Sequence, residues 1–391
     1  MESATGRIDG VGTAAGAELV TERDGHFVAS PKTTEEASAV LRYADESGGG
    51  VEVLGAGTKR GWAGATHARI VLETRGLAGV REHSWHDLTA TVGAGTIWAE
   101  MQGVLMQHGQ QVALDPLWPE NATVGGVIAA NDSGALRLKY GSLRDLVIGM
   151  TVVLPDGTIA RSGGKVVKNV AGYDLHKLMI GAFGTLAVVT EVTFRLHSIP
   201  RSTRVWTLET SDASACGAVL MKILDSQLSV QAMQLRANAK GFALDVQLAC
   251  IDEVLHAQLG VLDAFATIPG VVGGNVFGAR EQIFGGQGVV VKVTMLASVI
   301  AEASAEVVRL GGEAVAQSSG VMLARIPTAN SNALERLHQI VRVGGGSITV
   351  LRGANGLGVS PSAGSVAIVM REIKRRFDPK GTLNPGVVIG G

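Results

Sequence analysis

The chain has 391 residues, of which 46% are hydrophobic and 18% charged, and its 34 basic and 35 acidic side chains give a net charge of −1. This length has room for two domains, and the balanced charge gives no reason to expect nucleic acid or an anionic membrane surface as a partner. The two cysteines, Cys216 and Cys250, exclude a disulfide scaffold and an iron–sulfur cluster held by this chain alone.

The charged fraction lies below the ~25% that is usual for soluble proteins, so we expect another subunit to cover part of the surface. Residues 1–10 lack the apolar core of a signal peptide, and no run of the sequence reaches the ~18 apolar residues of a membrane span. We therefore expect a cytoplasmic protein with no direct membrane span, or one held at a membrane only through its partners.

The first elements read as a strand, a helix and a second strand. A short strand covers residues 26–30, and Thr33 and Glu36 then have the spacing of a capping box. Apolar residues recur at helical intervals until the three glycines at 48–50 stop the helix. A second strand, residues 51–54, runs directly into Gly55.

Strands and helices continue to alternate up to Pro200. A turn at residues 155–158 joins two of the strands into a predicted hairpin. The strands are expected at residues 70–73, 88–92, 110–114, 147–154, 159–161 and 187–196, and a helix at residues 96–107.

Beyond residue 201 the chain reads as a mixed α+β segment followed by a basic helix that ends at residues 371–376. The expected strands cover residues 205–209, 243–249 and 288–293, and the expected helices cover residues 213–224, 253–267 and 298–310.

The glycine-rich turn at residues 55–61 (G-A-G-T-K-R-G) directly follows a strand. Backbone N–H groups in such a turn form an anion-binding concavity, and a dinucleotide pyrophosphate is a usual guest. The spacing matches neither the nicotinamide-type G-x-G-x-x-G pattern nor the Walker G-x-x-x-x-G-K-[ST] pattern. By itself, such a turn is most often an ordinary loop.

Two further segments combine small residues with scattered hydrogen-bonding groups. One is residues 115–134 (D-P-L-W-P-E-N-A-T-V-G-G-V-I-A-A-N-D-S-G), continued by residues 140–145 (Y-G-S-L-R-D). The other is residues 165–190 (K-V-V-K-N-V-A-G-Y-D-L-H-K-L-M-I-G-A-F-G-T-L-A-V-V-T). Small residues let the backbone approach a ligand closely, and the hydroxyl and amide groups offer hydrogen bonds that an apolar core does not need.

These segments, in this order, resemble the flavin site of FAD-binding proteins of the vanillyl-alcohol-oxidase (PCMH) type. That family includes D-lactate dehydrogenases and the two flavin subunits of bacterial glycolate oxidase. The K-N-V-A-G-Y-D-L run at residues 168–175 is most similar to the glycolate oxidase subunits. The run F-D-P-K-G-T-L-N-P-G at residues 377–386 resembles the family's C-terminal signature, which in relatives returns to the flavin domain.

The resemblance implies an α+β fold in three parts. Residues 1–200 are expected to form a PCMH-type (vanillyl-alcohol-oxidase-like) FAD-binding domain of two α/β subdomains. Residues 201–345 are expected to form a smaller α+β cap domain in the position of the substrate domain. Residues 346–391 are expected to form a C-terminal tail that packs on the FAD domain.

The resemblance also implies which residues bind FAD. Relatives that bond covalently to the flavin through this loop carry a histidine at its fourth position, which here is Thr58, so we expect non-covalent FAD. The expected cofactor-binding residues are Gly55, Ala56, Gly57, Thr58, Lys59, Arg60, Gly61, Asp115, Thr123, Gly125, Gly126, Asn131, Ser133, Gly134, Tyr140, Gly184 and Val189.

Lys165 and Lys168 have two alternative interpretations. A cation near the N1 edge of the flavin ring would stabilise the anionic reduced flavin and so tune its redox potential. A solvated surface lysine is the ordinary alternative.

The catalytic apparatus of the family is missing from the sequence. The H-x-G-D-G-N-x-H metal-binding run and the G-E-H-G-I-G run of catalytic relatives are both absent, so the catalytic residues stay unknown. The nine histidines are scattered, which predicts no metal site.

The resemblance therefore favours the smaller FAD-binding subunit of a glycolate oxidase (glycolate dehydrogenase) complex. In that family it works beside a catalytic FAD subunit and an iron–sulfur subunit, and the complex oxidises glycolate to glyoxylate. Two alternatives stay open: a self-sufficient FAD enzyme acting on another small 2-hydroxy acid or alcohol, and a non-catalytic flavin-binding interaction subunit.

Overall fold

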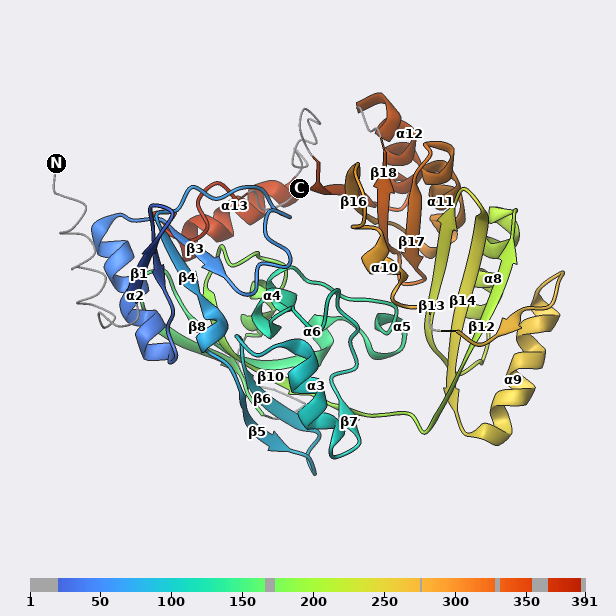
Figure 1. Ribbon diagram of the computed structural model, residues 1–391, viewed down its shortest axis with the longest axis horizontal. Coiled ribbons are helices and arrows are strands. Elements are labelled where there is room, and N and C mark those ends of the chain that lie inside the picture. Colours follow the sequence, from blue (N-terminus) through green and yellow to red (C-terminus); the bar gives the residue numbers. More distant parts are fainter. Residues whose placement is uncertain (1–19, 166–172, 275, 328–330, 354–364, 388–391) are drawn as a thin grey trace. The chain divides into compact units, whose positions relative to one another are not determined.

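The computed structural model describes residues 20–165, 173–274, 276–327, 331–353 and 365–387 (Figure 1). The chain divides into two compact units. Unit 1 comprises Met1–Ser133, Ser142–Ile199 and Pro361–Gly391, and unit 2 comprises Gly134–Gly141 and Pro200–Ser360. Residues 134–141, expected in the FAD-binding domain, and residues 346–353, expected in the C-terminal tail, group with unit 2.

Besides the two-stranded pairing of β7 (Gln110–Gln111) with β11 (His197–Ser198), the described residues of unit 1 form two larger sheets. The first has the spatial order β1 (Val20–Arg23), β2 (His26–Ala29), β4 (Ile70–Glu73) and β3 (Val51–Leu54). The second, which is antiparallel throughout, has the order β5 (Val80–Ser84), β6 (Thr89–Gly93), β10 (Val188–Arg195), β8 (Val147–Val153) and β9 (Ile159–Gly163).

The predicted strand–helix–strand entry is confirmed, with β4 inserted between its two strands. Both β2 and β3 run parallel to β4. Helix α2 (Thr34–Ser47) begins at the predicted capping box: the Thr33 hydroxyl accepts the Glu36 N–H at 3.1 Å, and the Glu36 carboxylate accepts the Thr33 N–H at 3.3 Å. The helix ends at Gly48 in the left-handed conformation, with φ of 67°.

Shorter elements complete unit 1. The strand expected at residues 110–114 shrinks to two residues, and β5 was not predicted because its V-R-E-H-S sequence has one aliphatic residue. The remaining elements are η2 (Thr74–Gly76), α3 (Trp98–Met106), β7 (Gln110–Gln111), α4 (Val124–Ala129), α6 (Leu143–Leu146), α7 (His176–Met179), β11 (His197–Ser198) and α13 (Ser365–Phe377).

Unit 2 is built on one antiparallel sheet of eight strands. Its spatial order is β15 (Val271–Val272), β12 (Ser202–Thr210), β14 (Gly241–Cys250), β13 (Val230–Asn238), β17 (Glu313–Gln317), β18 (Val321–Ile326), β16 (Val289–Thr294) and β19 (Ser347–Arg352). The helical elements are α5 (Arg137–Tyr140), α8 (Ala213–Leu224), α9 (Asp252–Phe265), α10 (Ala279–Gln282), η3 (Ala297–Val299), α11 (Ile300–Arg309) and α12 (Ser331–Arg342).

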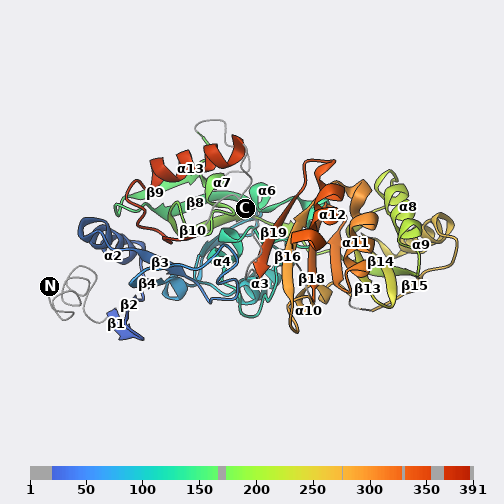
Figure 2. The ribbon, with the colours of Figure 1, turned by 90° about the horizontal axis from the view of Figure 1, so that it is seen from above.

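The two faces of this sheet differ in chemistry. Helices α8, α9, α11 and α12 cover one face, where Trp206, Leu244 and Met322 are buried in an apolar core (Figures 1 and 2). On strands β12–β14, alternate residues carry a polar network instead. The buried Asp245 carboxylate accepts hydrogen bonds from Thr207 at 2.9 Å and from the Arg236 guanidinium at 2.7 and 2.9 Å.

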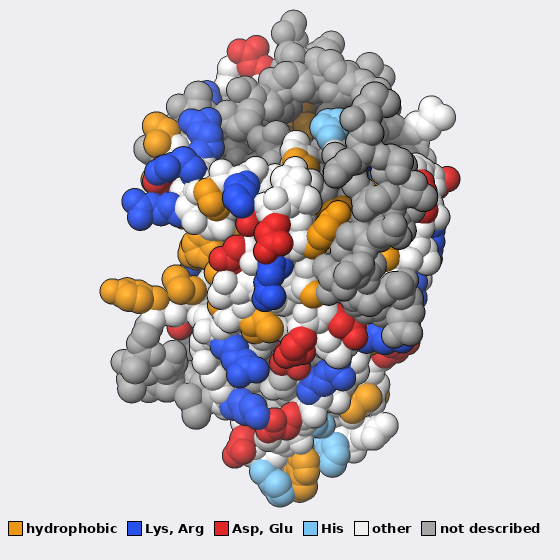
Figure 3. Space-filling model, turned by 90° about the vertical axis from the view of Figure 1, so that its left-hand side faces the viewer, with side chains coloured by type: hydrophobic (Ala, Val, Ile, Leu, Met, Phe, Trp, Pro, Cys, Tyr) orange, Lys and Arg blue, Asp and Glu red, His pale blue; other side chains and the backbone are white. Residues whose placement is uncertain are grey.

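The tail returns to unit 1, where Leu383 forms a parallel bridge with Val51 of β3. Leu383 is fully buried in the core between α2 and the first sheet. Basic and acidic side chains are interspersed over the face of the molecule in Figure 3. Among the described helices, none is long and apolar enough to cross a membrane.

Candidate functional site

A cavity of about 410 Å³ lies in unit 1 beside β3 and the glycine-rich loop that follows it. All seven loop residues, Gly55 to Gly61, line it. It also contains five more of the predicted cofactor-binding residues, which come from the second and third segments: Thr123, Gly125, Gly126, Gly184 and Val189. The fold thus brings the three segments together around one cavity.

Five predicted residues are described by the structure but are not among the residues that line this cavity: Asp115, Asn131, Ser133, Gly134 and Tyr140. Gly134 and Tyr140 belong to unit 2, where the Tyr140 hydroxyl accepts a hydrogen bond from Gln231 at 3.2 Å. Contact of these five residues with FAD stays a prediction.

The backbone at Gly55, where the loop begins, packs closely against the Thr123 side chain. A Cβ atom at Gly55 would lie 2.4 Å from the Thr123 hydroxyl oxygen, so a side chain there has no room. Thr123 is the N-cap of α4 and accepts the Gly126 N–H at 3.2 Å. Gly57 has φ of 75°, a conformation that side-chain-bearing residues rarely adopt. The loop therefore presents main chain to the cavity.

Lys59 of the loop forms a buried ion pair with Asp132. Its ammonium lies 3.2 Å from the Asp132 carboxylate and donates to the Leu117 carbonyl at 3.3 Å, and both charged side chains are at most 6% exposed. The ring centroids of Trp62 and Trp118 lie 5.9 and 5.5 Å from the ammonium, within cation–π range. A buried charge is tolerable when it is paired in this way.

Arg60, the second cation of the loop, is also paired. Its guanidinium contacts both carboxylate oxygens of Glu52 at 2.7 Å, and the Glu52 side chain is 7% exposed. Because each loop cation has its own carboxylate, the pairs are locally neutral. An anion at this loop would therefore be held chiefly by backbone N–H groups and only weakly by these cations.

The opposite wall of the cavity is largely apolar and was only partly predicted. Met179, Ala182, Phe183 and Ala187 contribute to it beside Gly184. Their hydrophobic side chains did not indicate a ligand-binding role, because such residues are equally typical of a hydrophobic core. Further lining residues that were not predicted include Thr66, Thr74, Asn384 and Val387.

Thr66 provides a polar atom that fits a ligand in this cavity. Its hydroxyl oxygen is buried and has no hydrogen-bond partner among the described residues. A buried hydroxyl without a partner is unfavourable unless a ligand or water satisfies it.

Part of the third segment, residues 166–172, lies outside the described residues, and Lys168 is among them. Lys165 is described and forms an ion pair with Glu82 on the surface, with 61% of its side chain exposed. The structure therefore gives Lys165 the surface role, and it is not among the residues that line the cavity.

His176 is the first residue of helix α7, whose last residue, Met179, belongs to the apolar wall. Its Nδ1 atom lies 3.1 Å from the Ser162 hydroxyl, and this hydroxyl also accepts the His176 N–H at 3.2 Å. The side chain is 3% exposed, and burial lowers the pKa of the imidazole. The neutral form is therefore the one that the fold accommodates.

Comparison with known proteins places this site in a family. The model described as FAD binding domain matches residues 26–163. D-lactate dehydrogenase of Archaeoglobus fulgidus is 30% identical over 93% of this chain and 91% of its own length. Glycolate oxidase subunit GlcE of Escherichia coli is 29% identical over 81% of this chain and 86% of its own.

Solved structures share the fold. Chitooligosaccharide oxidase superposes with a TM-score of 0.70 at 16% identity, covering 98% of this chain and 100% of its own. The expected PCMH-type α+β fold is thereby confirmed. The chain belongs to the family of FAD-dependent 2-hydroxy-acid dehydrogenases, and it is an oxidoreductase whose cofactor is FAD.

The lowered pKa of His176 predicts a pH dependence of stability. In the unfolded chain this histidine binds a proton below a pKa of about 6.5. In the folded chain burial disfavours the protonated imidazole. Stability should therefore be lost as the pH falls through that value, by up to about 1.4 kcal/mol per pH unit.

Urea unfolding of the wild type and of His176→Gln at about pH 8 and about pH 5 tests this dependence. The decrease in unfolding free energy should be smaller in the variant, because other titrating groups contribute to both proteins. Equal decreases would assign the effect to other groups.

Proposed function

We propose that FAD binds in the cavity of unit 1 with its pyrophosphate at the loop Gly55–Gly61. The close approach of Gly55 to Thr123 and the left-handed Gly57 support this placement, because they bring main chain to the cavity surface. The paired Lys59 and Arg60 leave the backbone N–H groups as the main anion-binding element. The apolar wall around Phe183 suits the flavin end of the cofactor.

When bound, FAD supplies the capacity to accept two electrons from an alcohol carbon. In this proposal the chain's own residues bind and orient the cofactor and exclude water from it. Gly55 to Gly61 hold the phosphates, Thr66 and Thr123 offer hydroxyl groups, and Met179 and Phe183 shield the apolar part.

The FAD should be held non-covalently. Covalent attachment needs a side chain such as histidine, cysteine or tyrosine that reaches the ring. Among the described residues that line the cavity, none is of these three types, and Thr58 occupies the loop position at which relatives carry the histidine.

We further propose that this protein is the FAD-binding subunit of a glycolate oxidase (dehydrogenase) complex. The observation that carries the proposal is the match to glycolate oxidase subunit GlcE over 86% of that subunit's length. Its partners would be a catalytic FAD subunit and an iron–sulfur subunit, and the complex would oxidise glycolate to glyoxylate in the cytoplasm or at a membrane through those partners.

The proposed need for partner subunits is consistent with the metal-binding side chains of this chain. Two cysteines cannot hold an iron–sulfur cluster. Cys216 is buried, and burial raises the pKa of its thiol to about 11. Within the described residues, no group of three histidine, cysteine or acidic side chains is placed to hold a metal ion. In this proposal the electrons leave the flavin through the iron–sulfur subunit.

A second candidate is a self-sufficient dehydrogenase acting on another small 2-hydroxy acid such as D-lactate. It is favoured by the match to D-lactate dehydrogenase over 91% of that enzyme's length. The two candidates share FAD chemistry and differ in whether this chain turns over substrate alone.

Gly57→Asp should abolish FAD retention, because a side chain in the left-handed conformation strains the loop and its negative charge opposes the phosphates. Flavin content per protein is measured from the visible spectrum. Gly48→Asp is the matched control, since Gly48 also has positive φ, at 67°, but caps α2 and does not line the cavity. Full flavin occupancy in folded Gly57→Asp would show that the loop has been misassigned.

Acid precipitation should release the flavin into the supernatant, because Thr58 offers no covalent attachment. The measurement is flavin absorbance in the supernatant and in the washed, redissolved pellet. Flavin that stays with the denatured polypeptide would contradict non-covalent binding.

The isolated chain should show little or no glycolate turnover, and turnover should appear when it is assembled with a catalytic flavin subunit and an iron–sulfur subunit. Steady-state assays with a dye acceptor, with glycolate and D-lactate as parallel substrates, compare the isolated chain with the complex. Comparable turnover by the isolated chain would reject the accessory role and favour the self-sufficient enzyme.

A further inference from the structure

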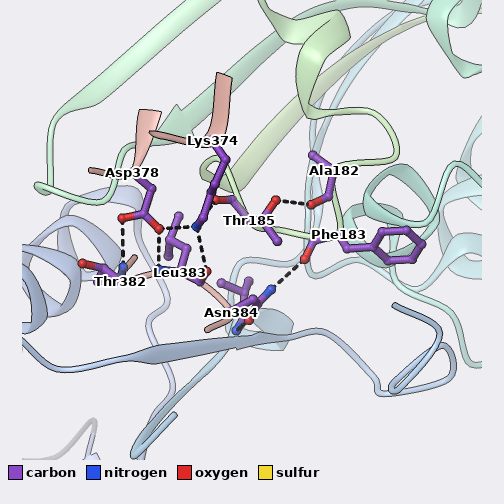
Figure 4. Close-up of polar contacts among 9 residues, drawn as sticks. Ala182, Phe183, Thr185, Lys374, Asp378, Thr382, Leu383 and Asn384 are labelled. Carbon is purple, nitrogen blue, oxygen red and sulfur yellow. Dashed lines mark hydrogen bonds and ion pairs between the residues drawn. The ribbon is translucent and has the colours of Figure 1, made fainter. Parts of the chain in front are cut away.

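The C-terminal tail contributes Asn384 and Val387 to the lining of the cavity, and Asn384 makes side-chain hydrogen bonds there. The carboxamide oxygen of Asn384 accepts the Val53 N–H at 2.8 Å. Its amide nitrogen donates to the Phe183 carbonyl at 2.6 Å (Figure 4). Val53 lies on β3, which leads into the glycine-rich loop, and Phe183 lies on the opposite wall. Asn384 lines the cavity and thus joins two of its walls.

The backbone at both ends of this contact has positive φ angles. Asn384 has φ of 45° and Phe183 has φ of 49°, values that few residues other than glycine adopt. Gly184 also has positive φ, and a Cβ atom there would lie 3.0 Å from the Asn384 amide nitrogen. Strained conformations of this kind persist only where the surroundings fix them, and they concentrate at ligand sites.

The tail is anchored by a partly buried ionic cluster of Lys374 and Asp378. The Lys374 ammonium donates to the Thr185 carbonyl at 2.8 Å and to the Leu383 carbonyl at 3.0 Å, and it pairs with the Asp378 carboxylate (Figure 4). Asp378 in turn accepts the N–H groups of Thr382 and Leu383 at 2.9 and 2.8 Å. These contacts tie the end of α13 to the segment that carries Phe183.

The tail also pairs with β3 through an isolated parallel bridge between Leu383 and Val51. The Val51 N–H donates to the Thr382 carbonyl at 2.7 Å, and the Asn384 N–H donates to the Val51 carbonyl at 2.8 Å. The side-chain contact to Val53 continues this ladder one step toward the loop. The position of β3, and with it the start of the loop, therefore depends on the docked tail.

We propose that Asn384 is a positioning residue for FAD and that the tail is a clasp whose docking is thermodynamically linked to cofactor binding. A ligand that requires the aligned walls stabilises the docked tail, and by linkage the docked tail strengthens the binding of that ligand to the same degree. This proposal rests on the proposed FAD site in the cavity. It assigns the C-terminal segment a part in cofactor retention.

The test is the dissociation constant of FAD for the full-length apoprotein, measured by flavin fluorescence titration. Asn384→Gly removes both side-chain hydrogen bonds and keeps a residue that accepts positive φ, so affinity should fall by about tenfold or more. Lys380→Ala is the control: it removes the tail's exposed ion pair with Asp45 at 2.8 Å, away from the cavity, and should change the affinity by less than about twofold.

Gly57→Asp, measured in parallel, separates the two proposals. If Gly57→Asp loses FAD and Asn384→Gly binds it as the wild type does, the clasp is rejected and the FAD site stands. If Gly57→Asp retains FAD, the proposed site itself fails. A purely structural role for Asn384 would lower the melting temperature of the apoprotein without weakening FAD binding beyond the control, and this outcome also rejects the clasp.

Hydrogen exchange of the wild type covers the case in which Asn384→Gly does not fold. Adding FAD should slow exchange in peptides containing Val53 and in peptides containing Thr382 and Asn384, because the linkage acts on both. Unchanged exchange in the tail upon FAD saturation would overturn the proposal.

Discussion

Close approach of glycine backbone to polar side chains is the constraint on which the cavity of unit 1 depends. At Gly55 the backbone of the loop lies against the Thr123 hydroxyl, and at Gly184 the opposite wall lies against the Asn384 amide, with no room for a Cβ atom at either place without displacement. These two contacts fix the distance between the segments. They also explain why residues from four separate parts of the sequence surround one cavity.

Electrostatic compensation is the second property of the site. Lys59 pairs with Asp132 and Arg60 with Glu52, so the loop can carry two basic side chains without creating a strong positive field. The buried Lys59 pair, which lies beside two tryptophan rings, ties the loop to the segment that follows residue 115. In this account the cations stabilise the loop's shape, and the backbone recognises the cofactor's phosphates.

Much of the fold of unit 1 could be predicted from local signals. The capping box at Thr33, the strand before Gly55 and the hairpin after residue 147 are all confirmed, because each is determined by neighbouring residues. Strand β13 was not predicted, because Gln231, Gln234 and Arg236 are polar although the sheet buries both glutamines. No local pattern marks a strand whose polar face is satisfied by distant partners.

The glycine-rich loop and Gly184 could be predicted as parts of the site from the sequence, whereas Asn384 and Thr66 could not. The contact of Asn384 with Val53 spans more than 300 residues of sequence, and the evidence for Thr66 is one buried hydroxyl without a partner among the described residues.

The most direct test of the whole account is an experimental structure with FAD bound. It should show the pyrophosphate within hydrogen-bond distance of the backbone N–H groups of residues 55–61, with no covalent link to the ring. A pyrophosphate bound elsewhere would contradict the account.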